Sequence, residues 1–161
     1  MPKKRASYLL CLFILILSAC GRETAPASNI ATASDDPCAS QNLPGTVRGI
    51  NDLMREFDDT SAQVAGISIQ DIPQVIAELQ RIRREAEDLR IPPCLGTLKT
   101  HQLNHMNLTI QALLAFVGGA DQQTLNDGLE QARQEHELYA LEMVRLLGIT
   151  LAPITATPSP P

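Results

Sequence analysis

Apolar side chains recur at steps of three and four residues between positions 43 and 147, with polar side chains between them. This spacing places the apolar residues on one face of an α-helix, which turns once every 3.6 residues. It predicts four helices, over about 43–64, 72–89, 93–117 and 121–147. Outside the first 20 residues, no segment shows the apolar–polar alternation typical of a half-buried strand.

Residues that commonly begin or end helices lie at the ends of these four predicted helices. Proline suits a first turn, aspartate a helix N-terminus and glycine a helix C-terminus. The residues with these expected roles are Pro44, Gly66, Asp71, Pro73, Pro92, Pro93, Gly118, Gly119, Asp121 and Gly148. Four amphipathic helices with short connections predict an all-α, up-down-up-down four-helix bundle over residues 42–149.

The segments on either side of this domain are different in composition. Residues 20–41 are mostly small and polar, and we interpret them as a flexible linker. Residues 150–161 are rich in proline and threonine and have no core-forming pattern, so we expect a disordered tail.

The first 20 residues have the layout of an export signal. Lys3, Lys4 and Arg5 precede an apolar run of ten residues, Tyr8–Leu17, which is too short to span a membrane. The following Leu17-Ser18-Ala19-Cys20 resembles the lipobox of bacterial lipoproteins. The resemblance implies that residues 1–19 are a cleaved signal peptide and that Cys20 carries the lipid.

Lipidation would anchor the chain to a membrane. Two or three acyl chains give stable attachment, at about 0.8 kcal/mol for each buried methylene. The resemblance therefore implies an exported protein at the cell membrane or the outer membrane, with its helical domain outside the cytoplasm.

Charge narrows the class of partner. Residues 1–19 contain three of the 13 basic residues and none of the 18 acidic residues, so cleavage leaves a net charge of −8. An acidic chain is a poor ligand for nucleic acid or for anionic lipid. The expected partners are the membrane, through the N-terminal lipid, and an envelope protein.

Two cysteines, Cys38 and Cys94, remain after cleavage and lipidation. In an exported chain such a pair is expected to form a disulfide. It would close a loop of about 57 residues and stabilise the fold by roughly 4 kcal/mol. Two free thiols are the alternative.

All three histidines fall in the last two predicted helices. His101 and His105 are one turn apart, and His136 takes an apolar position in the facing helix. Together they could bind zinc or copper, as histidines from facing helices do in other bundles. However, the helical angles place His105 at the flank of the apolar face and His101 on the far side from it. The alternative is that His136 is a hydrogen-bonded boundary residue and that no cofactor binds.

The sequence contains no GxSxG, phosphate-binding loop, HExxH or GxGxxG motif. The helical part resembles small uncharacterised helical lipoproteins in its Pro92-Pro93-Cys94 entry to a helix, a resemblance that implies no activity. The leading hypothesis is a non-enzymatic protein-binding or envelope-support module. The alternative is a metal- or cofactor-binding bundle that uses His105 and His136. An enzyme without a recognisable motif is the least favoured hypothesis.

Overall fold

The computed structural model describes residues 36–149. The expected signal peptide, Cys20, most of the linker and the tail at 150–161 lie outside this range. Within it the chain is mostly helical and has no strand, which confirms the all-α class.

The first predicted helix is divided into three pieces. These are α1 (Leu43–Thr46), α2 (Arg48–Ala62) and the 3₁₀ helix η1 (Gln63–Gly66). Pro44 lies in the first turn of α1, where its missing N–H removes no helical hydrogen bond. Val47 alone separates α1 from α2, and its backbone keeps helical dihedral angles.

The next helix, α3 (Ile72–Asp88), begins as predicted after Asp71 and has Pro73 in its first turn. The expected cap by the Asp71 side chain is wrong, because that carboxylate makes no hydrogen bond to the helix N-terminus. Asp71 Oδ2 instead accepts a hydrogen bond of 2.7 Å from the hydroxyl of Ser68.

Two long helices complete the described chain. The 3₁₀ helix η2 (Pro93–Leu95) leads into α4 (Gly96–Val117), and α5 (Gln122–Leu147) follows. Asp121 caps α5, since its Oδ1 accepts a 2.8 Å hydrogen bond from the Thr124 N–H. Gly148 ends α5 with a positive φ of 65°, a conformation that glycine adopts without steric cost.

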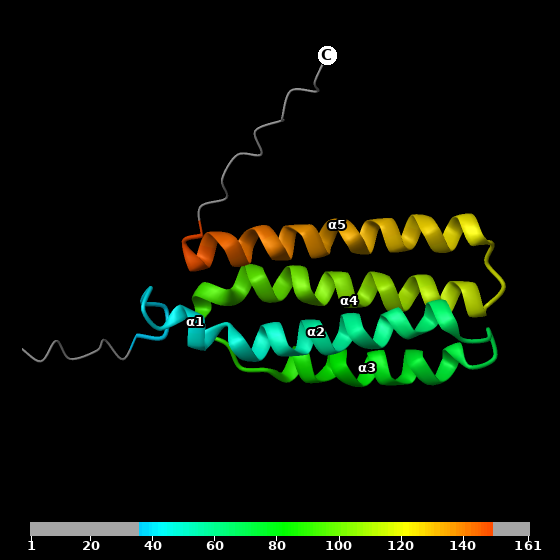
Figure 1. The fold of residues 1–161 in the computed structure, drawn as a ribbon, viewed down its shortest axis with the longest axis horizontal. Helices are drawn as coiled ribbons and strands as arrows, with labels where there is room; N and C mark the ends of the chain where they lie inside the picture. Colours follow the sequence, from blue (N-terminus) through cyan, green and yellow to red (C-terminus); the bar gives the residue numbers. More distant parts are fainter. Residues whose placement is uncertain (1–35, 150–161) are drawn as a thin grey trace, which may run out of the picture. The chain divides into compact units, whose positions relative to one another are not determined.

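Figure 1 shows α2, α3, α4 and α5 lying side by side. α3 packs against α2 and α4, and α5 packs mainly against α4. The buried apolar side chains come from every α-helix and from η2, and they form one core. Its largest fully buried members are Phe57, Ile50, Met54, Leu79, Ile82, Leu95, Leu98 and Met106.

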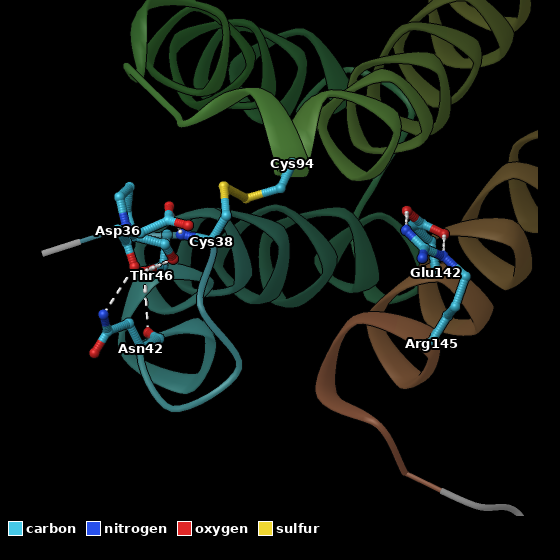
Figure 2. Close-up of a disulfide and its surroundings, with 8 residues drawn as sticks. Asp36, Cys38, Asn42, Thr46, Cys94, Glu142 and Arg145 are labelled. Carbon is cyan, nitrogen blue, oxygen red and sulfur yellow. Dashed lines mark hydrogen bonds and ion pairs between the residues drawn. A yellow bond between two sulfur atoms is a disulfide. The ribbon is translucent and has the colours of Figure 1, made fainter. Parts of the chain in front are cut away.

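A disulfide joins Cys38 to Cys94, as the sequence predicted (Figure 2). Cys38 lies just before α1, and Cys94 lies in η2 at the start of α4. Hydrogen bonds order the segment around Cys38: its N–H donates to Asp36 Oδ1, and Asn42 and Thr46 donate to nearby carbonyl oxygens. The disulfide therefore attaches the first described residues to the helical core.

Within residues 36–149, none of the helices combines the length and the apolar character needed to cross a membrane.

Candidate functional site

His105 on α4 makes hydrogen bonds through both of its ring nitrogens. Its Nδ1 lies 2.9 Å from the carbonyl oxygen of Ala132 on α5. Its Nε2 lies 3.1 Å from Oδ1 of Asp58 on α2. The His105 side chain is only 11% exposed, so these contacts join three helices at a largely buried point.

His136 on α5 contacts the other oxygen of the same carboxylate. Its Nε2 lies 3.1 Å from Asp58 Oδ2, and the two imidazole rings meet edge to face with centroids 5.1 Å apart. The edge of the His105 ring also packs against Phe57, at 5.6 Å between centroids. One carboxylate thus bridges the two histidines, and we call Asp58, His105 and His136 the bridged triad.

The backbone contact fixes the direction of one hydrogen bond of His105. A carbonyl oxygen can only accept, so Nδ1 of His105 donates to Ala132. Its Nε2 then faces Oδ1 of Asp58.

Tyr139 lies one turn beyond His136 on α5 and is buried. Its hydroxyl donates to Oδ1 of Asn51 at 3.5 Å. Burial, assisted by the negative charge of Asp58, raises the pKa of Tyr139 well above its ordinary value. The phenol is therefore a hydrogen-bond donor at neutral pH and not a base.

The structure brings together two of the three predicted metal ligands. His105 and His136 are adjacent, but His101 lies apart, with its Nδ1 2.8 Å from Oε2 of Glu135 on α5. His101 was expected on the far side of the helix. It is only 22% exposed because α4 is covered by α5 on that side as well as by α2 and α3.

Among residues 36–149, no group of three or more His, Cys, Asp or Glu side chains is placed to hold a metal ion. The pair His105 and His136 could supply two ligands, and Asp58 already lies within hydrogen-bond distance of the nitrogens that would bind the metal. A metal would have to replace those contacts.

Asp58 was not among the predicted site residues. It belongs to no recognisable motif, and the available signal was its place four residues after the core residue Met54, on the same side of the helix.

A cavity of about 700 Å³ opens beside the bridged triad. Its lining comes from the end of α2, η1, the segment between η1 and α3, the start of α3, α4 from His105 to Phe116 and α5 from Gln122 to His136. His105 and His136 are part of its wall, together with Thr109, Arg133 and a larger number of apolar side chains. Its volume lies within the range of small-molecule sites, about 300–1,000 Å³.

Comparisons of this chain with protein-family models, with curated proteins and with solved structures gave no match.

Proposed function

We propose that this chain is an exported bacterial lipoprotein, anchored through a lipid on Cys20 after cleavage of residues 1–19. Its helical part, residues 42–149, is in this proposal an up-down-up-down four-helix bundle that stands outside the cytoplasm. It works as a non-enzymatic module that binds an envelope protein or supports an envelope assembly.

The observation that carries this proposal is the disulfide between Cys38 and Cys94. Disulfides persist mainly in oxidising compartments outside the cytoplasm, so the bond supports export. Its position also suits a tethered domain. Cys38 lies near the end of the linker, and the bond attaches that point covalently to the start of α4. A pull on the linker is then transmitted to the core without unwinding α1.

Exposed leucines on α5 support a protein-binding role. Leu138 is 44% exposed and Leu141 is 57% exposed. Residues three apart lie on the same side of a helix, so the two side chains form a small apolar patch. Exposed apolar patches commonly mark sites of protein contact.

The anchoring proposal is tested by Cys20→Ser. We expect the native chain to incorporate labelled palmitate and to sediment with membranes, and the variant to do neither. Cys38→Ser is the matched control, because it removes a cysteine that the proposal leaves unlipidated. A Cys20→Ser chain that stays fully membrane-bound would overturn the proposal.

The partner-binding proposal is tested by crosslinking in intact cells. A photoreactive side chain at position 141 should give a discrete crosslinked product, whereas the same group at Glu130, on the charged surface of α5, should not. The same crosslinking pattern from both positions would contradict a patch-specific contact.

The second candidate function is metal binding by His105 and His136, which the 5.1 Å separation of their rings favours. Titration of zinc and copper into protein purified without a histidine tag tests it. We expect tight binding that His105→Ala abolishes and that His101→Ala, the matched control, leaves unchanged. An affinity weaker than micromolar would exclude this function.

A further inference from the structure

The cavity beside the bridged triad is elongated. On α4 its lining runs from His105 to Phe116, which corresponds to roughly 16 Å at 1.5 Å per residue. Over this length its walls are formed mainly by apolar side chains of α2, α4, α5 and the segment before α3. The shape suits a single extended alkyl chain better than a compact ring system.

The edge of the cavity leaves large apolar side chains in water. Ile67 and Ile69, on the segment between η1 and α3, are 36% and 53% exposed, and Leu129 on α5 is 36% exposed. All three line the cavity. An alkyl chain in the cavity would cover them, so the hydrophobic effect favours its binding.

The lining side chains with a guanidinium or imidazole group lie toward one end of the cavity. His105, Arg133 and His136 lie at that end, while Leu113, Phe116 and Leu125 lie toward the other, together with the uncharged amide of Gln122. The described contacts of Arg133, to Glu130 and Glu137, use three of the five N–H donors of its guanidinium. Although the whole chain is acidic, none of the described residues that line the cavity is Asp or Glu.

Thr109 is an independent indication of a ligand. It lines the cavity one turn from His105, is 4% exposed, and its hydroxyl has no hydrogen-bond partner in the described structure. A buried hydroxyl is normally paired. A polar ligand atom at this point of the cavity would supply the missing partner.

We propose that this cavity binds a single-chain amphiphile whose head group accepts hydrogen bonds, a long-chain fatty acid being the simplest member of the class. The alkyl chain lies along α4 toward Phe116, and the carboxylate lies near Arg133 and His136. This site goes beyond the proposed anchoring and partner binding and does not depend on either.

Displacement of a fluorescent fatty acid tests the site. The protein is the mature chain with Cys20→Ser, prepared without detergent, because detergents are themselves amphiphiles and would compete. We expect dodecanoate to displace the probe at micromolar concentration, dodecanol to do so more weakly, and dodecyltrimethylammonium to be at least tenfold weaker than dodecanoate. Failure of dodecanoate to displace the probe, or equal potency of the cationic compound, would overturn the proposal.

Two pairs of variants locate the binding. Leu129→Trp narrows the cavity and should weaken the binding of dodecanoate at least tenfold. Leu141→Trp, which places the same side chain on α5 outside the cavity, should not. Arg133→Gln should weaken the binding of dodecanoate several-fold and leave the affinity for dodecanol unchanged. Arg145→Gln is its control, because Arg145 pairs with Glu142 in the same i, i+3 geometry away from the cavity.

If Leu129→Trp and Leu141→Trp bind dodecanoate equally well, the ligand lies outside the cavity and the proposal fails. If Arg133→Gln weakens the binding of dodecanoate and of dodecanol equally, the carboxylate does not lie near Arg133. Circular dichroism of each variant shows that it is folded. Because these measurements use unlipidated protein, their failure leaves the anchoring proposal to its own test.

Discussion

Nε2 of His105 lies 3.1 Å from Oδ1 of Asp58, and this contact joins α4 to α2. His105→Leu removes it together with the hydrogen bond to Ala132. We expect the free energy of unfolding to fall by about 1–2 kcal/mol, because two hydrogen bonds are lost but both are only partly buried and the Asp58 side chain is 37% exposed. Urea unfolding followed by circular dichroism measures it.

His136→Leu is the matched variant. The His136 side chain is 40% exposed, so water can replace its contact with Asp58. Its unfolding free energy should change by less than about 1 kcal/mol. Equal losses in the two variants would mean that His105 is not the residue that holds the triad together.

The disulfide gives a second prediction. Changing Cys38 and Cys94 together to alanine should lower the free energy of unfolding by about 2–5 kcal/mol, because the unfolded chain loses a constraint across 56 residues. Reduction of the native protein should lower the urea midpoint to a similar extent. A change below about 1 kcal/mol would show that the packing of α1 already holds this end of the chain in place.

The helices and their ends were largely predictable from the sequence. The spacing of apolar residues predicted the bounds of α3, α4 and α5 nearly to the residue. Each of these helices is bounded by a proline, glycine or aspartate, and the effect of such a residue on a helix end depends only on its near neighbours in the sequence. The break at Val47 was missed, because it interrupts the helix without changing the regular spacing of the apolar residues. The cap at Asp71 was wrong because Ser68, three residues earlier, engages the same carboxylate.

The site was less predictable than the fold. The proximity of His105 to His136 follows from pairing two antiparallel helices about a short turn. The role of Asp58 depends on the third helix, α2, whose rotation about its own axis is set by packing across the core. The cavity is lined by side chains from six segments of the chain, so no single segment of sequence predicts it.

Gly128 on α5 lies against Ala112 on α4. A Cβ added at Gly128 would lie 2.8 Å from Cβ of Ala112, a distance that real Cβ atoms do not reach. Gly128→Ala should therefore lower the free energy of unfolding by about 1–3 kcal/mol, although alanine is normally favoured over glycine in a helix. Thermal unfolding monitors the change.

Gly45→Ala is the control for this prediction. Gly45 lies in α1, and a Cβ added there meets nothing within 4 Å. We expect it to leave stability unchanged or to raise it by up to about 1 kcal/mol. If Gly128→Ala proves as stable as Gly45→Ala, the two long helices can separate at no cost.

Thr109→Val should stabilise the protein. The variant replaces a buried hydroxyl that lacks a partner with a methyl group of similar size, and so removes a desolvation cost. We expect an increase of about 1 kcal/mol in the free energy of unfolding, measured in urea. Loss of stability would mean that the hydroxyl is paired in solution, for instance with water.

The cap of α5 gives the prediction for pH. The hydrogen bond from the Thr124 N–H lowers the pKa of Asp121 below its ordinary value. Because the pKa is lower in the folded than in the unfolded state, the ionised carboxylate stabilises the fold at pH values above the unfolded pKa, about 3.9. This stabilisation is lost as the pH falls through the folded pKa. Asp121→Ala should thus lower the melting temperature at pH 7, and the difference from the native protein should shrink toward pH 2.

Asp121→Asn separates the cap from the charge. Asparagine still accepts the Thr124 hydrogen bond but does not ionise, so this variant should stay near native stability at pH 7. Its melting temperature should fall less steeply than that of the native protein between pH 5 and pH 2. Asp127→Asn, also on α5, controls for the loss of one negative charge from the helix. If Asp121→Asn follows the native curve throughout, the cap works through its hydrogen bond alone, and the charge on Asp121 does not contribute to the acid sensitivity of the fold.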